Sequence, residues 1–253
     1  MNEIDSSMNG RVALVTGGGG GIGSAICRRL AQAGAKILIT YRSNEEKATA
    51  VLQSLAGEGH AVYQASVTNS DEMKKLAETV TAHFGKLDLL VNNAGITTPV
   101  PHDDLDGLSD EWIDKIFQTN VRGAFATLRA FKPLLLKSDS ALVINLSSIA
   151  AVTGIGSNVA YCASKAAMDS MTRSLARALA PDIRVVSVSP GWVLGEYAKR
   201  MDPAYIQQQA DSTPLKRLAS PEDVADTIWA VATAMPFMTG NIVPVDGGRP
   251  LSP

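Results

Sequence analysis

The chain has 253 residues, 45% of them apolar, and a formal net charge of −2 at pH 7. That length suits one large α/β domain, which can bury enough surface to need neither a disulfide nor a metal site. The near-neutral charge argues against a nucleic acid or an anionic membrane as a partner.

The first ten residues, MNEIDSSMNG, lack the basic and apolar regions of a signal peptide, and we expect residues 1–9 to form a loose tail. No apolar run approaches the roughly 18 residues of a membrane span. The two cysteines, Cys27 and Cys162, fall in predicted helices and provide no disulfide framework. This favours a reduced, cytoplasmic compartment.

A glycine-rich turn follows the first predicted strand. Residues 11–16 read as a buried strand, six glycines fall within residues 17–23, and residues 24–34 have the apolar spacing of a helix. Such a turn lets the backbone approach a pyrophosphate, and the helix N-terminus offers free N–H groups to it. A flexible linker is the alternative, but linkers do not join a buried strand to an amphipathic helix.

The end of the second strand, predicted over residues 36–41, bears on the choice of cofactor. NAD sites usually carry an acidic residue here that binds the ribose 2′-hydroxyl. This chain has no carboxylate before Glu45, whereas Arg42 and Ser43 could bind a 2′-phosphate. We therefore favour NADP(H) over NAD(H), with a solvated surface charge as the alternative role for Arg42.

The remaining elements alternate in a βα pattern, which predicts an α/β doubly wound Rossmann fold with a seven-stranded parallel sheet and helices on both faces. Residues 1–253 are read as one domain, in which residues 192–213 form a mobile substrate flap. Ser220 is predicted to cap the helix that starts at Pro221. Further strands are predicted at residues 60–65, 87–91, 142–146, 183–189 and within 238–248, and further helices at residues 44–55, 70–83, 109–136 and 157–179.

Three residues could carry acid–base chemistry. Tyr161 and Lys165 are four residues apart, so on a helix they share one face, and Ser148 follows a predicted strand thirteen residues upstream of Tyr161. A phenol has a pKa of about 10, and a neighbouring ammonium would favour its charged form and make it a better acid or base. A lone YxxxK pattern is far more often an ordinary pair of helix residues. The assignment of acid–base chemistry to Tyr161 and Lys165 therefore depends on the other motifs of the chain.

Taken together, the motifs resemble the short-chain dehydrogenase/reductase family almost from end to end. No single motif is decisive, but all occur in order and at the family's spacing. They are TGGGGGIG (16–23), NNAG (92–95), Asn120, Ser148, YCASK (161–165), PGWV (190–193) and VDGG (245–248).

The resemblance implies catalytic roles for four residues. Tyr161 corresponds to the catalytic acid/base, and Ser148 to the hydroxyl that polarises the carbonyl. Lys165 corresponds to the residue that binds the nicotinamide ribose and lowers the pKa of the tyrosine. Asn120, predicted within a helix, corresponds to the residue that holds a proton-relay water. The predicted cofactor site comprises Gly17, Gly20, Gly21, Ile22, Gly23, Tyr41, Arg42, Ser43, Ser66, Val67, Asn93, Ala94, Gly95, Tyr161, Lys165, Pro190, Gly191 and Val193, and no metal site is predicted.

Three positions depart from the family pattern. Ser66 replaces the usual aspartate that faces the adenine, and Gly195 replaces a common Thr or Ser that binds the nicotinamide. Gly20 stands where NADP-preferring members often have a basic residue, so Arg42 would act alone.

The predicted activity is NADP(H)-dependent transfer of a hydride between nicotinamide and a carbonyl or secondary alcohol. The closest pattern is that of 3-oxoacyl thioester reductases. The family resemblance also implies a homotetramer, with the two long helices and the C-terminal segment as its subunit interfaces. Alternatives are an NAD-linked sugar or polyol dehydrogenase and a non-catalytic cofactor-sensing regulator on the same fold. The predicted substrate pocket is largely apolar, and its residues are Ala150, Val152, Ile155, Trp192 and Leu194. An acyl carrier partner would need a basic patch at the mouth of this pocket, which could be formed by Arg122, Arg129 and Arg173. The alternative is that these three arginines are ordinary solvated charges on helices.

Overall fold

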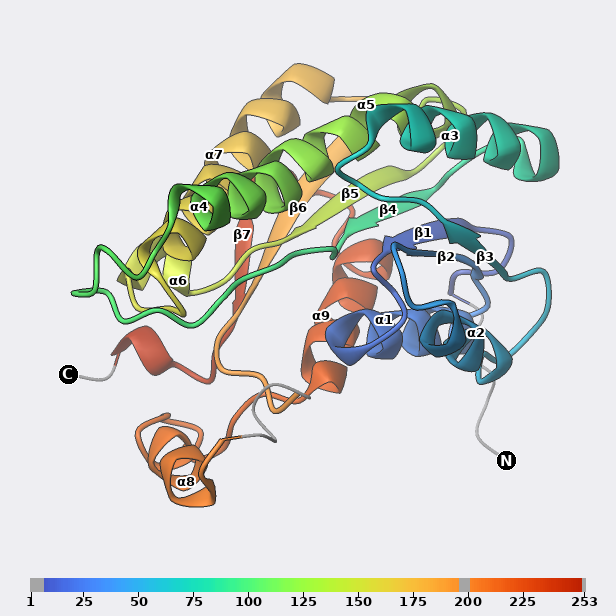
Figure 1. The fold of residues 1–253 in the computed structure, drawn as a ribbon. Coiled ribbons are helices and arrows are strands. Elements are labelled where there is room, and N and C mark those ends of the chain that lie inside the picture. Colours follow the sequence, from blue (N-terminus) through green and yellow to red (C-terminus); the bar gives the residue numbers. More distant parts are fainter. Residues whose placement is uncertain (1–6, 196–200, 252–253) are drawn as a thin grey trace.

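The computed structural model describes residues 7–195 and 201–251. A parallel sheet forms its centre, and helices cover both faces (Figure 1). Within the described residues, the sheet has the predicted seven strands, and their order is β3-β2-β1-β4-β5-β6-β7. The strands are β1 (Val12–Thr16), β2 (Lys36–Tyr41), β3 (Ala61–Gln64), β4 (Leu89–Asn92), β5 (Ala141–Leu146), β6 (Ile183–Pro190) and β7 (Ile242–Val245).

The order of the strands creates a natural ligand site. Strand β1 pairs in parallel with β2 on one side and with β4 on the other. In open sheets of this kind, ligands bind beyond the carboxyl ends of the strands where the winding direction reverses. That edge of the sheet, at the ends of β1 and β4, is where the glycine turn and the NNAG motif lie.

The helices form two layers. Helices α1, α2 and α9 cover one face of the sheet, and α3, α5 and α7 cover the other (Figure 1). Because both faces are covered, β1 and β5 are buried along their whole length, which explains their continuous apolar sequences. The helices are α1 (Gly21–Gln32), α2 (Glu45–Gln53), α3 (Ser70–Phe84), α4 (Asp110–Phe117), α5 (Ala124–Leu135), α6 (Ala150–Thr153), α7 (Val159–Leu179), α8 (Pro203–Asp211) and α9 (Pro221–Thr233).

The helix predicted over residues 109–136 is interrupted. Between α4 and α5 the chain forms a π-helical turn, η1 (Gln118–Gly123), which contains the fully buried Asn120. Turns of this kind inside helices are frequent at functional sites. The regular apolar spacing of the segment gave no sign of the interruption.

The prediction of a loose tail over residues 1–9 is wrong for the part that the structure describes. Met8 is fully buried in the core, and its backbone N–H donates to the Ala33 carbonyl at 2.9 Å. Ser7 accepts a hydrogen bond from the Trp229 indole at 3.0 Å. The segment just before β1 therefore packs between α1 and α9.

The predicted flap over residues 192–213 includes the short helix α8, and its residues 196–200 lie outside the described part of the chain. Figure 1 shows α8 standing apart from the two helical layers, on the same side as the C-terminus. No helix of residues 7–195 and 201–251 is both long and apolar enough to cross a membrane.

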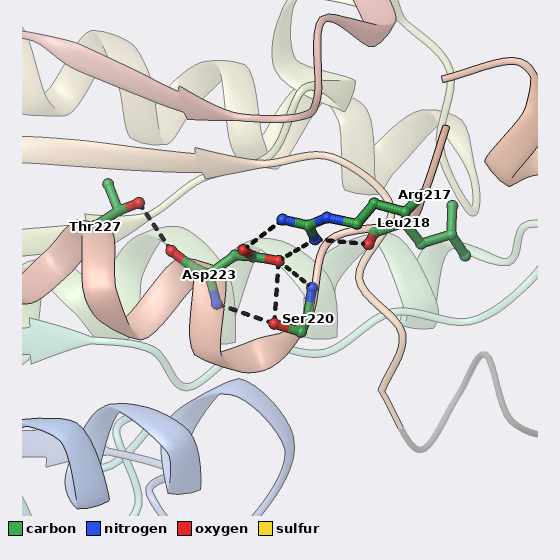
Figure 2. A network of polar contacts seen from close by, with 5 residues as sticks. All are labelled: Arg217, Leu218, Ser220, Asp223 and Thr227. Atoms are coloured by element: carbon green, nitrogen blue, oxygen red, sulfur yellow. Dashed lines mark hydrogen bonds and ion pairs between the residues drawn. The ribbon is translucent and has the colours of Figure 1, made fainter. Parts of the chain in front are cut away.

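A polar network anchors the chain between the flap and α9 (Figure 2). Ser220 caps α9 as predicted: its hydroxyl accepts from the Asp223 N–H at 3.1 Å, and the Asp223 carboxylate accepts from the Ser220 N–H at 2.7 Å. Arg217 binds the same carboxylate with two nitrogens, at 2.5 and 2.8 Å. The Arg217 guanidinium holds the pKa of Asp223 well below its ordinary value.

We expect Ser220→Ala to lower the free energy of unfolding by about 1 kcal/mol, because it removes the cap of α9. Urea unfolding of wild type and variant measures this change. Ser174→Ala, on the exposed face of α7, is the matched control and should cause no such loss. Equal stability of Ser220→Ala and wild type would show that the cap contributes nothing.

Candidate active site

The glycine turn is shaped to meet an anion. Gly17 and Gly21 have φ values of +64° and +52°, which side chains other than glycine rarely adopt. No side chain caps α1 at Gly20, so the first N–H groups of the helix have no side-chain acceptor. A Cβ on Gly23 would lie 2.6 Å from both the Asn93 side chain and the Gly17 carbonyl. The turn therefore needs glycine, and α1 presents the partial positive charge of its N-terminus.

Asn93 ties the NNAG loop to this turn. Its side-chain amide donates to the carbonyls of Thr16 at 2.8 Å and Gly17 at 3.1 Å. In return, the Thr16 hydroxyl accepts from the N–H groups of Asn93 and Ala94, at 3.1 and 3.0 Å. The carboxyl ends of β1 and β4 are thus joined into one rigid floor.

A cavity of about 380 Å³ lies over this floor. It matches a large part of the predicted cofactor site, and its walls also include residues that sequence reasoning missed. The predicted lining residues are Gly17, Gly20, Ile22, Tyr41, Arg42, Ser66, Val67, Asn93, Ala94 and Gly95, and the missed ones are Thr40, Ala65, Thr68, Ile96 and Thr119. Thr40 lies near the end of β2, and Ala65, Thr68 and Ile96 follow β3 and β4, so the positions of the strand ends could have indicated these four. Thr119 lies in η1, which the sequence did not indicate.

The other predicted cofactor residues lie elsewhere. Gly191 and Val193 line a second cleft, together with Tyr161. Gly21, Gly23, Ser43 and Pro190 line neither cavity, and Lys165 is buried beneath the surface. At the adenine end, the Ser66 hydroxyl bonds the Thr68 hydroxyl at 2.8 Å, and its N–H donates to Glu72 at 2.8 Å.

The second cleft has a volume of about 800 Å³, and Ser148 and Tyr161 both line it. Of the five predicted pocket residues, Ala150, Ile155 and Trp192 line the cleft. The prediction is wrong for Val152 and Leu194, which are 73% and 45% exposed instead. Val152 lies on the short helix α6, which was not predicted, and Ala150 and Thr153 of that helix line the cleft instead.

Asn158 positions Tyr161 at the start of α7. Its side chain accepts from the Tyr161 N–H at 2.7 Å and donates to the Thr98 carbonyl at 2.7 Å. The cap thus fixes the first turn of the helix and also holds the loop that follows β4. Because α7 begins here, Tyr161 and Lys165 come from successive turns of one helix face.

Lys165 is buried below the tyrosine. Its ammonium donates to the Leu146 carbonyl at 2.6 Å and lies 5.6 Å from the centroid of the Tyr161 ring. Burial lowers the pKa of Lys165 to about 8, against the opposing effect of the Asp169 carboxylate. The lysine is therefore poised to lose its charge in mildly alkaline solution.

In the protein without a cofactor, the pKa of Tyr161 is not lowered as the resemblance implies. Burial raises the pKa of Tyr161, and a hydrogen bond with Ser148 opposes that effect only in part. Desolvation disfavours the phenolate, and the Lys165 ammonium donates to the Leu146 carbonyl. The lowering of the Tyr161 pKa by Lys165 remains a prediction for the cofactor-bound protein.

Asn120 joins the loop after β4 to α7. Its amide nitrogen donates to the Ile96 carbonyl and the Ser164 hydroxyl, both at 3.1 Å, and its oxygen accepts from the Ile96 N–H at 2.8 Å. A Cβ on Gly95 would lie 3.3 Å from that oxygen and 3.8 Å from the Lys165 ammonium. Asn120 and Lys165 therefore both lie next to Gly95.

Sequence reasoning missed Asp169, one helical turn beyond Lys165. It is 3% exposed, and neither of its carboxylate oxygens has a hydrogen-bond partner within the described residues. Its position four residues after Lys165 on a predicted helix could have indicated that the carboxylate lies near the lysine. The carboxylate acts on Lys165 through its charge rather than through a direct bond.

Comparison with known proteins agrees with this geometry. A family model described as enoyl-(acyl carrier protein) reductase matches residues 17–249. A 3-oxoacyl-(acyl-carrier-protein) reductase from Staphylococcus aureus is 35% identical over 245 residues, which cover 93% of this chain and 96% of that protein. The chain belongs to the short-chain dehydrogenase/reductase family. Another relative in this family is the 3-oxoacyl-(acyl-carrier-protein) reductase from Synechocystis, which is 35% identical over 248 residues, covering 96% of this chain and 98% of that protein.

Solved structures of short-chain dehydrogenases/reductases share the fold over nearly the whole chain. A member from Brucella melitensis, described as a glucose/ribitol dehydrogenase, superposes with a TM-score of 0.90 at 31% identity, covering 97% of this chain and 98% of that one. The protein is therefore an oxidoreductase that acts on C=O or CH–OH groups with a nicotinamide cofactor.

Proposed function

We propose that the protein reduces a carbonyl group with NADPH, with Tyr161 as the proton donor. The observation that carries this proposal is the joint position of Ser148 and Tyr161, which line one cleft, with Ser148 near enough to oppose the rise in the pKa of Tyr161 that burial causes. Two hydroxyls that share one cleft wall can both bind a single carbonyl oxygen.

The residues present fit a dinucleotide cofactor. The glycine turn leaves the N-terminus of α1 free for a pyrophosphate, and the adjoining cavity follows the ends of β1, β2, β3 and β4. When bound there, the nicotinamide supplies the hydride. Gly191 and Val193, which line the cleft near Tyr161, would hold the nicotinamide end.

The side chains of the cleft have separate tasks in this mechanism. Ser148 polarises the carbonyl, and Tyr161 gives its proton to the oxygen as negative charge develops there. The cationic Lys165 stabilises the resulting phenolate and would bind the cofactor ribose. Asn120 holds the loop after β4 against α7 and would keep a relay water near Lys165, so that Tyr161 can be reprotonated.

We infer that a 3-oxoacyl thioester is the substrate, because two relatives are named as reductases of this type and because apolar residues such as Ala150, Ile155 and Trp192 line the cleft. An NAD-linked polyol dehydrogenase is the second candidate. It is favoured only by the description of the Brucella structure. Turnover of a panel of ketones, 3-oxoacyl thioesters and polyols distinguishes the two.

A basic patch for an acyl carrier finds limited support. Arg122 donates to the Thr68 carbonyl at 2.9 Å, and Arg129 donates to Ser70 at 3.3 Å while its guanidinium lies 5.8 Å from the Phe125 ring centroid. These two bonds connect η1 and α5, which carry the arginines, to the chain at the start of α3. Each of these bonds goes to an uncharged oxygen, so the two guanidinium groups keep their charge but are partly held by contacts within the subunit.

We also propose a single-domain subunit that acts in the cytoplasm as a homotetramer. All seven strands of the described chain lie in one sheet, which supports one domain. The buried free thiols of Cys27 and Cys162 suit a reducing compartment. Apolar side chains are exposed on the helices α4 and α5, where Trp112, Phe125 and Leu136 would pack against a second subunit.

We expect Arg42→Ala to weaken NADPH binding by about tenfold or more while leaving NADH binding nearly unchanged. Arg42 lines the cofactor cavity, and no carboxylate in the described part of the chain pairs with it. A charge-assisted bond to a 2′-phosphate contributes roughly 1.5–3 kcal/mol, and 1.4 kcal/mol corresponds to a factor of ten. Titration of both cofactors into wild type and variant measures the effect, and equal losses for NADPH and NADH would overturn the assignment.

A further inference from the structure

One cation lies in the substrate cleft without an acidic partner among the described residues. Arg249 belongs to the short helix η3 (Arg249–Leu251) after β7, and it is the one lysine or arginine among the described residues that line the cleft. Tyr161 and Ser148 line the same cleft. The proposed mechanism gives Arg249 no task.

Hydrogen bonds hold the Arg249 guanidinium in place. One terminal nitrogen donates to the Gln209 carbonyl at 3.2 Å and to the Thr213 hydroxyl at 3.4 Å, and the other donates to the Gln209 side chain. The guanidinium also lies 5.9 Å from the centroid of the Trp192 ring. A guanidinium has five N–H donors, so these three bonds leave two of them for a ligand.

No carboxylate among the described residues neutralises the charge of Arg249. All three acceptors are uncharged, and no carboxylate within residues 7–195 and 201–251 forms an ion pair with it. Arg217 and Arg29, by contrast, pair with Asp223 and Asp226. Partial burial lowers the pKa of Arg249, and the charge of Tyr205 opposes this effect. Keeping an unpaired cation in an apolar cleft has a cost that a bound anion would offset.

We propose that Arg249 determines substrate specificity by binding an anionic oxygen group, a carboxylate or a phosphate, on the part of the substrate remote from the reacting carbonyl. This inference rests on the proposed function. The planar guanidinium suits two parallel bonds to such a group. The anion can belong to the substrate itself, as the carboxylate of an oxo acid, or to the phosphorylated arm of a carrier thioester.

The alternative role for Arg249 is purely structural. Its bonds to Gln209 and Thr213 tie the C-terminal segment to α8, and this link alone could explain its presence. A structural link would affect all substrates alike, whereas an anion site would affect only charged ones. Matched pairs of substrates that differ by one charge therefore separate the two roles.

The test compares wild type with Arg249→Met, which removes the charge but keeps an extended side chain. Gln209→Ala is the matched control, because it weakens the link and keeps the cation. The substrates are 3-oxo acids with their methyl esters, and 3-oxoacyl thioesters of pantetheine with and without the phosphate. We expect Arg249→Met to lower kcat/KM about 10- to 100-fold for the anionic member of one pair, mainly through KM, and less than about threefold for its neutral member.

The pair that shows this selective loss identifies the source of the anion. Losses of equal size for charged and neutral members in both pairs would overturn the proposal and leave Arg249 a structural link. Arg249→Lys should restore only part of the preference for the anion. It retains the positive charge but loses the planar guanidinium that can form two parallel bonds.

A binding measurement keeps the proposal testable if the variant or the wild type turns over no substrate. Calorimetry would compare a 3-hydroxy acid, its methyl ester and the phosphorylated and unphosphorylated hydroxyacyl pantetheines. Binding of an anionic alcohol that depends on Arg249, without reduction of any carbonyl, would support the anion site and contradict the proposed function. Equal binding of charged and neutral members by wild type would contradict the anion site, whatever the activity.

Discussion

Tyr161→Phe is expected to reduce turnover by about 10² to 10⁴-fold, the range that a positioned general acid contributes. The substitution removes the proton that would neutralise the developing alkoxide, and it leaves the ring in place. The glycine turn and the cavity over β1 and β4 are remote from the lost hydroxyl, so cofactor affinity should remain nearly unchanged. Initial rates of NADPH oxidation and a titration with NADPH measure the two quantities.

Ser148→Ala is the natural companion to this variant. It removes the hydroxyl that bonds the phenol and keeps the tyrosine itself. Both variants should unfold at a temperature close to that of wild type, because neither leaves a charge buried. Near-normal turnover by Tyr161→Phe would show that another group donates the proton.

Lys165→Met is expected to cost about 10²-fold or more in turnover and to change the pH profile. The ammonium is buried beneath Tyr161, and its pKa is lowered to about 8. A lysine carries its charge below its pKa, so wild-type activity should fall as the pH rises through about 8. The methionine variant has no such ionisation and should lack this decline.

Asp169→Asn provides a graded control for this interpretation. The Asp169 carboxylate raises the pKa of Lys165 against the effect of burial. Its neutralisation should therefore lower that pKa further and move the alkaline decline of activity to lower pH. Tyr161 and the Cys162 thiol also lie near this helix face, but burial raises the pKa of both. A decline that stayed at the same pH in Asp169→Asn would assign it to a group other than Lys165.

Local patterns predicted most of the fold. The strand over residues 36–41 has the predicted bounds, because a short apolar run between a glycine and a polar turn has few alternatives. The turn at Gly17–Gly23 could also be inferred, since only a backbone without Cβ atoms allows its positive φ values and the close approach of Asn93. These features depend on residues close together in the sequence.

Features that depend on tertiary contacts could not be predicted in this way. Met8 stands in a polar segment without periodicity, and its burial results from the space between α1 and α9. The direction of the Tyr161 pKa depends mainly on burial, which the YxxxK spacing does not contain. Arg249 of η3, which follows β7, lines the cleft beside α8 of a distant part of the sequence, to which it is hydrogen-bonded through Gln209.

The most direct test of the central claim is the rate of NADPH oxidation by the wild-type protein across a panel of ketones and 3-oxoacyl thioesters. We expect substrate-dependent oxidation with at least one member of the panel, and its loss in Tyr161→Phe. Tight binding of NADPH without oxidation by any carbonyl would contradict the account and favour a protein that senses the cofactor.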